Sequence, residues 1–495
     1  RAARRVGQAI PPPRAGMWPA GVEEPGPPAK DLGASAPARA LRCLCAPCLC
    51  FAACCGLCGL GAILPLLGLL LLAVGPASTS YYVDVLSIKL NGYGGALCAA
   101  SRDGCETAVG FPGADTRAYM TYEEEVRREE LLPRRIKSGE AYRGNELGNV
   151  RLSAYVYPEF PLSWNASRHD RVRPYANRLW GSEAETWSRE SVRESAHAYL
   201  AAVNDTFEVD HHVSKWVELY LHKMTLGLDL SDDEVERFLA FQKSIQTYVN
   251  LPDFLNPILP AVPPVAAVAA ERERLVAVYS AAIADGTASA LAGVPASART
   301  DVARLCLAAL TFAGGLGVPH ALRSMFALVY SEQSPAGRFR ELSALSEDEL
   351  EAFVYEALRM FPPVIEYAWV ERATGLRQMM VQMKALRDPA VWGEGADEFL
   401  VRDLETYRRY SGIGWAEPAN GVERRGRRWA QKDDSRGCPG QDLSLRMIVE
   451  FLREWGRTKR GWHVAEAPRG GISFTGPAYH NPPVAKPFTL LRGQL

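Results

Sequence analysis

The segment Ser435-Arg436-Gly437-Cys438-Pro439-Gly440-Gln441-Asp442 leads directly into a run in which apolar residues recur every three or four positions. That spacing predicts an amphipathic helix, whose apolar face consists of Leu445, Ile448, Leu452 and Trp455. A cysteine just before a helix lies close to backbone N–H groups that have no partner within the helix, and these favour the thiolate form. The thiolate is the form that binds metal ions, so the segment places Cys438 where metal binding is favoured; a buried structural cysteine is the other interpretation of these residues alone.

The whole segment resembles the haem-binding loop of the cytochrome P450 family, in which an arginine stands two residues before the cysteine and a glycine two residues after it. The resemblance implies that Cys438 ligates the iron of a haem group (iron protoporphyrin IX). It also implies that Arg436 binds a haem propionate and that Gly440 lets the backbone approach the flat macrocycle. The family usually has phenylalanine and glycine seven and four residues before the cysteine, where this chain has Gln431 and Asp434. A turn around a buried structural cysteine is the alternative interpretation of Cys-Pro-Gly taken alone.

A second resemblance lies upstream, at Glu356-Ala357-Leu358-Arg359. Glu356 and Arg359 share one face of a helix and can form a charge pair, and the two prolines that follow end that helix. The pattern is similar to the Glu-x-x-Arg helix of the family, which braces the haem-binding side of the fold. Asp403 stands where the family has a third bracing arginine, with Arg402 beside it, so the sequence does not predict a complete Glu–Arg–Arg network. An ordinary surface ion pair is the other interpretation.

The third resemblance is the apolar stretch 310–318, which contains Thr311 and the pair Gly314-Gly315. Adjacent glycines inside a helix cost roughly 1 kcal/mol each relative to alanine, which makes sense if a flat cofactor packs against them; a close helix–helix contact is the alternative. Oxygen-activating members of the family follow such glycines with an acidic residue and a threonine. This chain has Gly317 and Val318 there, and neither side chain can donate a proton.

In lacking the acidic residue and the threonine, the chain resembles the hydroperoxide-rearranging branch of the family, which includes allene oxide synthases and hydroperoxide lyases. The stretch Trp415-Ala416-Glu417-Pro418-Ala419-Asn420-Gly421 is also similar to one that precedes the cysteine in that branch. The resemblance implies an enzyme that cleaves or rearranges fatty acid hydroperoxides, a lipid-like substrate, without external oxygen or reductant. Cys438 then donates electron density that favours cleavage of the oxygen–oxygen bond, and Thr311 orients the hydroperoxide. In that branch an asparagine stands at the position of Thr311.

Two alternatives remain open at the level of sequence. The first is a P450 monooxygenase that takes electrons from a reductase and uses molecular oxygen. The second is a haem-binding protein with impaired turnover. The reductase is a partner only in the first case.

The basic run Arg168-His169-Asp170-Arg171-Val172-Arg173 occurs at about the distance from the N-terminus where the family has a basic helix. By that resemblance Arg173 is a candidate partner for a haem propionate, and a solvated run of charges is the alternative. The stretch between Val364 and Arg387 is shorter than the family norm, which predicts that a small sheet hairpin is missing.

The composition indicates a globular protein with no electrostatic preference for nucleic acid. Of 495 residues, 47% are apolar and 23% charged, and the formal net charge is −1. The expected fold class is mainly α with minor β, in one haem-thiolate P450 domain over 80–495. Short strands are expected at 150–156 and 471–474, and helices at 191–203, 213–228, 233–248, 266–292 and 346–360. Ser346 and Glu349 form a capping-box pattern at the start of the last helix.

The N-terminal part differs in composition from the rest. The segment 1–42 is rich in Pro, Ala, Gly and Arg and is expected to be disordered. The segment 43–75 has no charged residue and is long enough to cross a bilayer, which needs about 20 apolar residues. It predicts a membrane anchor, as in the endoplasmic reticulum or a plastid envelope, with its orientation left open; a cleaved targeting segment is the alternative.

Overall fold

The computed structural model divides the chain into two compact units, Arg1–Ala73 and Val74–Leu495. All residues that the structure describes belong to the second unit. They are 116–119, 141–143, 146–147, 150–151, 166–248, 257–330, 342–363, 366–371, 377–381, 386–410, 437–458, 462–465 and 488–492. The predicted segments 1–42 and 43–75 lie outside them, as do Arg436, Gln431, Asp434, Trp415–Gly421 and the strand expected at 471–474.

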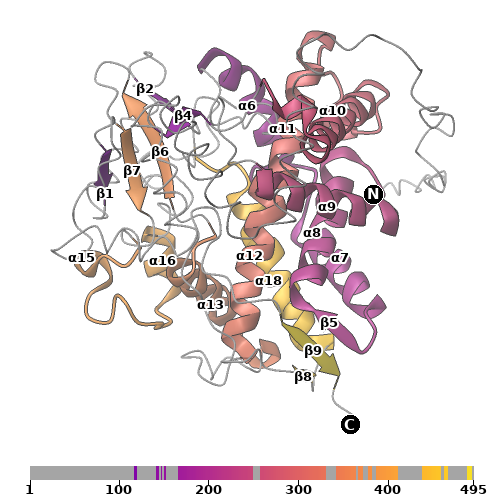
Figure 1. Cartoon of the computed structure of the whole chain (residues 1–495). Helices are drawn as coiled ribbons and strands as arrows, with labels where there is room; N and C mark the ends of the chain where they lie inside the picture. Colours follow the sequence, from indigo (N-terminus) through magenta and orange to yellow (C-terminus); the bar gives the residue numbers. More distant parts are fainter. Residues whose placement is uncertain are drawn as a thin grey trace, which may run out of the picture. The chain divides into compact units, whose positions relative to one another are not determined.

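Helices make up most of the described chain (Figure 1). In order they are α6 (Ala166–Trp180), α7 (Arg189–Ala202), α8 (Val209–Leu226), α9 (Asp232–Tyr248), α10 (Pro263–Ala284), α11 (Arg299–Ala308), α12 (Gly314–Tyr330), α13 (Glu347–Met360), α15 (Pro389–Trp392), α16 (Leu404–Tyr410) and α18 (Gln441–Thr458). The helices expected from apolar spacing are confirmed as α7, α8, α9, α10 and α13, with ends that shift by a few residues. The exception is α10, which ends at Ala284 and is followed by a short 3-10 helix, η4 (Ser289–Leu291).

The capping box predicted for α13 is present. The Ser346 side chain accepts from the backbone N–H of Glu349, and the Glu349 carboxylate accepts from the backbone N–H of Ser346 at 2.8 Å. Two N–H groups that have no partner within the helix are thereby satisfied. The capping box therefore fixes the start of α13, the helix that carries Glu356 and Arg359.

Short strands form three small sheets. The largest has the order β1 (Thr116–Tyr119), β7 (Arg377–Val381), β6 (Glu366–Glu371) and β2 (Ala141–Arg143). β3 (Glu146–Leu147) pairs with β4 (Val150–Arg151), and β9 (Thr489–Arg492) lies between β5 (Thr206–Glu208) and β8 (Trp462–Val464). The prediction of a missing hairpin after Val364 is wrong, because β6 and β7 pair antiparallel there, with Glu366 opposite Val381.

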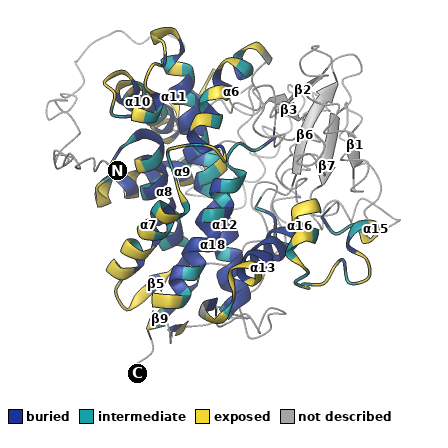
Figure 2. Ribbon diagram, turned by 180° about the vertical axis from the view of Figure 1, so that it is seen from behind, coloured by how far each residue is buried: buried dark blue, intermediate teal, exposed yellow. Residues whose placement is uncertain are grey.

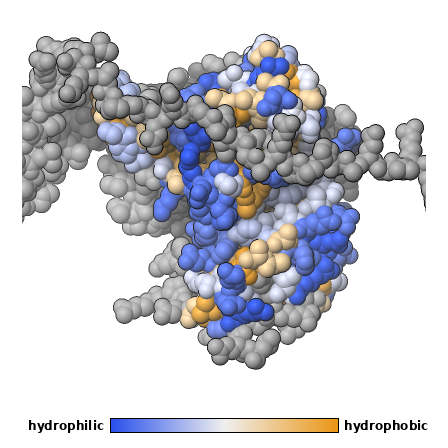
Figure 3. Space-filling model, turned by 90° about the vertical axis from the view of Figure 1, so that its right-hand side faces the viewer, coloured by the Kyte–Doolittle hydropathy of each residue, from blue (hydrophilic) through white to orange (hydrophobic). Residues whose placement is uncertain are grey.

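The central helix of the fold runs from α11 through the π-helical segment η6 (Ala309–Ala313) into α12. It packs against α8, α10 and α18 and is largely buried (Figure 2). Aromatic side chains fill the core around Trp455 of α18. Its ring centroid lies 4.6 Å from that of Phe207 and 4.8 Å from that of Phe326. On the face shown in Figure 3, hydrophilic side chains cover most of the coloured surface, as expected for amphipathic helices.

One helix in the described part of the chain is long and apolar enough to cross a membrane, and it is the central helix, Ala296–Tyr330. Most of its residues are buried inside the protein. Packing within the fold therefore accounts for its apolar character.

Candidate functional site

Cys438 precedes α18, as the sequence predicts. It is partly buried and forms no disulfide with another cysteine of the described residues. The Gly440 carbonyl accepts a hydrogen bond from the backbone N–H of Ser444 at 2.8 Å, so helical bonding begins two residues after the cysteine. The predicted apolar face of α18 is buried, with Leu452 and Trp455 at 0% and 2% exposure. The thiol is thus carried by a turn attached to a core helix.

The end of α6 packs against this turn. A Cβ atom added to Gly440 would lie 3.6 Å from Cβ of Trp180, which is ordinary van der Waals contact. The Trp180 indole also donates to the Thr225 hydroxyl at 3.1 Å and so joins α6 to α8. The neighbouring protein atoms leave room for a Cβ atom at position 440, so packing within the protein does not require glycine there. The close approach of the Gly440 backbone to a macrocycle stays a prediction.

The basic run 168–173 forms the first part of α6 and is not simply a solvated charge run. Arg173 is 4% exposed, and its Nε donates to Asn177 Oδ1 at 3.1 Å. Arg168 and Arg171 bind the two carboxylate oxygens of Asp301 on α11 at 2.9 and 2.8 Å. Burial opposes ionisation of Asp301, but the hydrogen bonds from these arginines outweigh it and lower its pKa. Two arginines therefore anchor α6 to the central helix, and a third is buried.

The central helix changes its winding where the sequence places Thr311. The five residues Ala309–Ala313 are π-helical, a form that is rare and frequent at functional sites. Thr311 is 1% exposed, and its hydroxyl has no hydrogen-bond partner among the described residues. A buried hydroxyl without a partner is unfavourable by about 1–3 kcal/mol, so this atom is a candidate contact for a bound molecule.

Gly315 does not face a cofactor. A Cβ atom at this position would collide with the Leu310 carbonyl oxygen, the Glu218 carboxylate and the Gln242 side-chain amide. The close helix contact, which was the alternative interpretation, is therefore the reason for this glycine. Gly317 differs, since a Cβ there would meet no atom within 4 Å. Val318, the next residue, is buried at 2% exposure.

A buried polar cluster beside Gly315 is the part of the site that sequence reasoning missed. Glu218 on α8 is 0% exposed, and its Oε1 accepts from Gln242 Nε2 at 2.5 Å. His222 Nδ1 donates to the Glu218 backbone carbonyl at 2.9 Å, and its Nε2 lies 2.8 Å from the Tyr279 hydroxyl. Burial raises the pKa of Glu218, although hydrogen bonding to His222 and Gln242 opposes the rise. The only sequence signal is an acidic residue within an apolar stretch of α8, Trp216 to Leu221.

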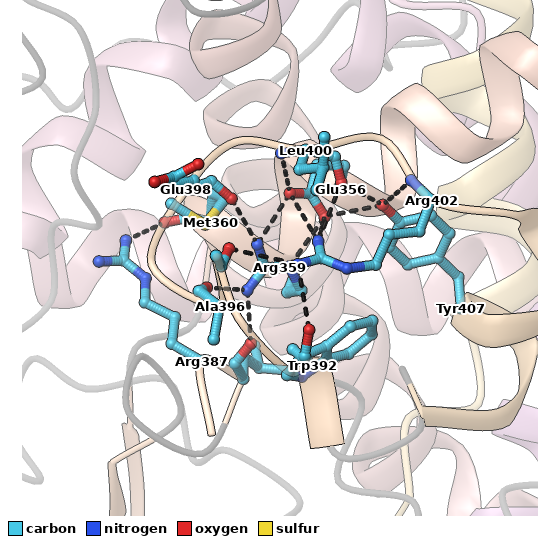
Figure 4. A network of polar contacts seen from close by, with 12 residues as sticks. Glu356, Arg359, Met360, Arg387, Trp392, Ala396, Glu398, Leu400, Arg402 and Tyr407 are labelled. Carbon is cyan, nitrogen blue, oxygen red and sulfur yellow. Dashed lines mark hydrogen bonds and ion pairs between the residues drawn. The ribbon is translucent and has the colours of Figure 1, made fainter. Parts of the chain in front are cut away.

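Glu356 and Arg359 form the expected pair, and both side chains are buried (Figure 4). Arg359 Nε and Nη2 each donate to one Glu356 oxygen at 2.8 Å. Arg359 also donates to the backbone carbonyls of Leu386, Ala396 and Glu398. The surface-pair interpretation is thereby excluded. In this geometry the two residues fasten the segment 386–400 to α13, which is a bracing role and not contact with a substrate.

Arg402 supplies the second cation of this network, although Asp403 occupies the position expected for it. Arg402 Nη1 lies 3.3 and 3.4 Å from the two Glu356 oxygens, and the Tyr407 hydroxyl donates to Glu356 Oε2 at 2.7 Å (Figure 4). The guanidinium groups of Arg359 and Arg402 also lie 5.1 and 5.5 Å from the Trp392 ring centroid. Asp403 instead caps α16 by accepting from the Thr406 backbone N–H at 2.9 Å. The Glu–Arg–Arg network is therefore complete, with a shift of one residue.

The elements that carry the predicted site residues meet. α6, α18 and the central helix contact one another, which brings the elements of Arg173, Cys438 and Thr311 into one region. α13, with the Glu356–Arg359 pair, contacts both α12 and α18. Among the described residues no group of three or more His, Cys, Asp or Glu side chains has the geometry to hold a metal ion.

Comparison of the sequence with known proteins yields no relative: no family model matches, and no curated protein matches. Solved structures do match. The chain is similar to P450BioI in complex with a hexadec-9Z-enoic acid-ligated acyl carrier protein, at 14% identity and a TM-score of 0.57, over 82% of this chain and 100% of that one. It is also similar to the myxobacterial cytochrome P450 CYP267B1 in complex with myristic acid, at 15% identity and a TM-score of 0.56, over 82% and 97%.

A third similar structure is the substrate-free cytochrome P450 CYP150A6 of Mycobacterium marinum, at 15% identity and a TM-score of 0.55, over 82% of this chain and 96% of that one. Likeness at this level of identity concerns the backbone fold. The helical architecture, the Glu356–Arg359–Arg402 brace and the cysteine before α18 agree with it, and the fold of this chain is that of the cytochromes P450.

Proposed function

We propose that the protein is a haem-thiolate enzyme with Cys438 as the iron ligand. The observation that carries this proposal is the placement of Cys438 on the turn before α18 in a chain with the cytochrome P450 fold. A single thiolate ligand is what a haem requires, whereas a zinc site needs three or four protein ligands.

The surrounding residues fit such a group. Arg173 is a buried cation on the helix that packs against the cysteine turn, and it is suited to a haem propionate. The central helix contributes a buried hydroxyl without a partner at Thr311 and open space beside Gly317. These features suit a planar group between α18 and the central helix. Gly315, by contrast, is occupied by contacts with α8 and α9 and has no part in the fit.

The finer proposal is rearrangement or cleavage of fatty acid hydroperoxides. When bound, haem supplies an iron centre that cleaves an oxygen–oxygen bond. Thr311 donates its hydroxyl proton in a hydrogen bond to an oxygen of the substrate, since no described protein group takes that proton. Gly317 and Val318 have no proton to give, which agrees with a substrate that already carries its oxygen. P450BioI and CYP267B1 were solved with fatty acyl groups, and this supports a lipid-like substrate here.

One observation favours the alternative, a reductase-dependent monooxygenase. Glu218 is a buried carboxyl group beside the π turn, and burial raises its pKa. Residues 317 and 318 have no proton to give, and Glu218 is an acidic side chain beside the same turn of the central helix. The two functions therefore have to be separated by experiment.

The test begins with haem binding by the full-length protein. We expect the haem-loaded, reduced protein to give the carbon monoxide difference spectrum of a thiolate-ligated haem. Cys438→Ser should abolish that spectrum. Cys306→Ser is the matched control, because Cys306 is a buried thiol on the central helix whose pKa is raised by burial. Retention of the parent spectrum by Cys438→Ser would refute the assignment.

The second step separates the reactions. We expect the protein to consume a polyunsaturated fatty acid hydroperoxide without reductant, seen as loss of conjugated-diene absorbance that depends on Cys438. Product formation only with NADPH and a reductase would instead establish the monooxygenase. Haem binding with neither activity would indicate a protein with impaired turnover.

Our proposal extends to 43–75, which we expect to anchor the protein in a membrane because of its length and lack of charge. The full chain should then resist extraction from membranes at alkaline pH. Release of the full chain under those conditions would contradict the anchor.

A further inference from the structure

The π turn of the central helix is held from outside by one side-chain amide. Gln242 on α9 is 3% exposed, and its Nε2 donates to the Leu310 backbone carbonyl at 2.9 Å. The same nitrogen donates to Glu218 Oε1 at 2.5 Å. Leu310 belongs to the π-helical segment, and Glu218 lies on α8. One amide therefore links α8, α9 and the central helix at a single point.

Gly315 makes this arrangement possible. The Leu310 carbonyl oxygen, the Glu218 carboxylate and the Gln242 amide all occupy the space that a Cβ atom at position 315 would need. The π turn, the glycine and the two polar side chains are thus fitted to one another. The neighbouring residue in the turn is Thr311, whose buried hydroxyl lacks a partner among the described residues.

We propose that Glu218 and Gln242 are positioning residues that hold the π turn, and with it the Thr311 hydroxyl, in the conformation used by the proposed haem site. This inference rests on the proposed function for its catalytic consequence. The restraint of the π turn, which we call the hold, needs no bound group, because it consists of the hydrogen bond from Gln242 to the Leu310 carbonyl.

Burial raises the pKa of the Glu218 carboxyl group and so favours its protonated form. Its Oε2 has no hydrogen-bond partner among the described residues and lies 3.4 Å from His222 Nδ1. That nitrogen donates to the Glu218 backbone carbonyl at 2.9 Å, and His222 Nε2 lies 2.8 Å from the Tyr279 hydroxyl. Burial raises the pKa of Tyr279 and of the Cys306 thiol, so both remain protonated. Burial therefore disfavours the ionised form of the Glu218 carboxyl group, and the neighbouring His222 opposes this effect.

The first experiment measures hydrogen exchange of the amides of residues 309–317 in the full-length protein. Gln242→Ala and Glu218→Ala should speed this exchange at least tenfold. Glu218→Gln should leave it near the parent rate, because glutamine is neutral and keeps an oxygen for Gln242 Nε2. Ser244→Ala is the matched control on α9, since its hydroxyl bonds only to Ala240 in its own helix among the described contacts. Unchanged exchange in Gln242→Ala would overturn the hold.

The second experiment asks whether the hold matters for the site. Myristic acid is titrated into the haem-loaded proteins, and hydroperoxide turnover is measured beside it. Gln242→Ala and Glu218→Ala should weaken binding or slow turnover at least fivefold, and Glu218→Gln should restore both. Faster exchange with unchanged binding and turnover would show a purely structural contact and refute positioning. If the parent binds no haem, the proposed function fails and the positioning role with it, while the exchange result still decides the hold.

Discussion

At the scale of single residues, two nearby glycines of one helix have opposite roles. Gly315 is fitted against the Leu310 carbonyl and two side chains from other helices, whereas Gly317 faces open space. The sequence gives no reason to distinguish the two, since both are glycines inside the same helix. Only the three-dimensional surroundings distinguish a required glycine from one that merely lowers helix stability.

This difference predicts opposite effects of one substitution. Gly315→Ala should lower the free energy of unfolding by about 2 kcal/mol or more, because backbone and buried polar atoms cannot move aside cheaply. Gly317→Ala should raise it by up to about 1 kcal/mol, through better helix propensity. Urea unfolding of both variants checks the prediction. Equal effects at the two positions would contradict the account of Gly315.

Glu218 predicts a dependence of stability on pH. Burial raises its folded-state pKa above the ordinary value of 4.5, so the unfolded chain releases this proton at lower pH than the folded protein does. Stability from this group is therefore complete below about pH 4.5 and falls as pH rises, by up to about 1.4 kcal/mol per pH unit, until the folded carboxyl ionises.

Glu218→Gln removes this titration. The stability of the parent relative to Glu218→Gln should therefore decline between pH 5 and pH 7 in urea unfolding. A difference that stays constant over this range would show that the folded carboxyl has an ordinary pKa.

At the scale of elements, the brace below α13 depends on how the chain returns after β7. The segment 386–403 folds back so that its carbonyls meet Arg359, and Arg402 reaches Glu356 from that segment. Each buried charge has several partners, which is the condition for an ion pair in a protein interior. The sequence places Asp403 where the second arginine of the network is expected, yet Arg402 takes that role. The conformation of the loop, and not the position in the sequence, determines which side chain points toward Glu356.

The brace yields a paired prediction. Arg402→Gln should lower the free energy of unfolding by about 2 kcal/mol, because the carbonyls of Trp392 and Gly395 and one side of Glu356 lose their donor. Asp403→Asn should have little effect, because asparagine caps a helix as well as aspartate does. Thermal unfolding of both variants measures this. A larger loss from Asp403→Asn would contradict the assignment of Arg402 to the network.

At the scale of the whole molecule, stability is concentrated where the central helix meets α8 and α18. Side chains on these three helices are buried over most of their length, whereas α15 and α16 carry few buried residues (Figure 2). Regions with many buried apolar contacts open only with global unfolding, and peripheral ones open locally.

Native-state hydrogen exchange should therefore be slowest in α12 and α18 and clearly faster in α15 and α16. The slow amides should share one denaturant dependence, equal to that of global unfolding. Separate dependences for α12 and α18 would show that they unfold independently, contrary to their contact in the core.

The sequence by itself was sufficient for features that depend on near neighbours. Helical spacing, the Ser346–Glu349 capping box, the Glu356–Arg359 pair and the position of Cys438 before a helix all involve residues within a few positions of one another. Their geometry follows from the pitch of a helix and from its unpaired end groups, whatever the rest of the chain does.

Tertiary structure alone decided the features that join distant parts of the chain. Gln242 meets Leu310 across 68 positions, and Arg402 meets Glu356 across 46. The hairpin after Val364, the π turn and the need for Gly315 likewise depend on what packs beside them. Buried polar groups must find partners wherever the folded chain brings them, and the choice of partner is a property of packing that no local pattern records.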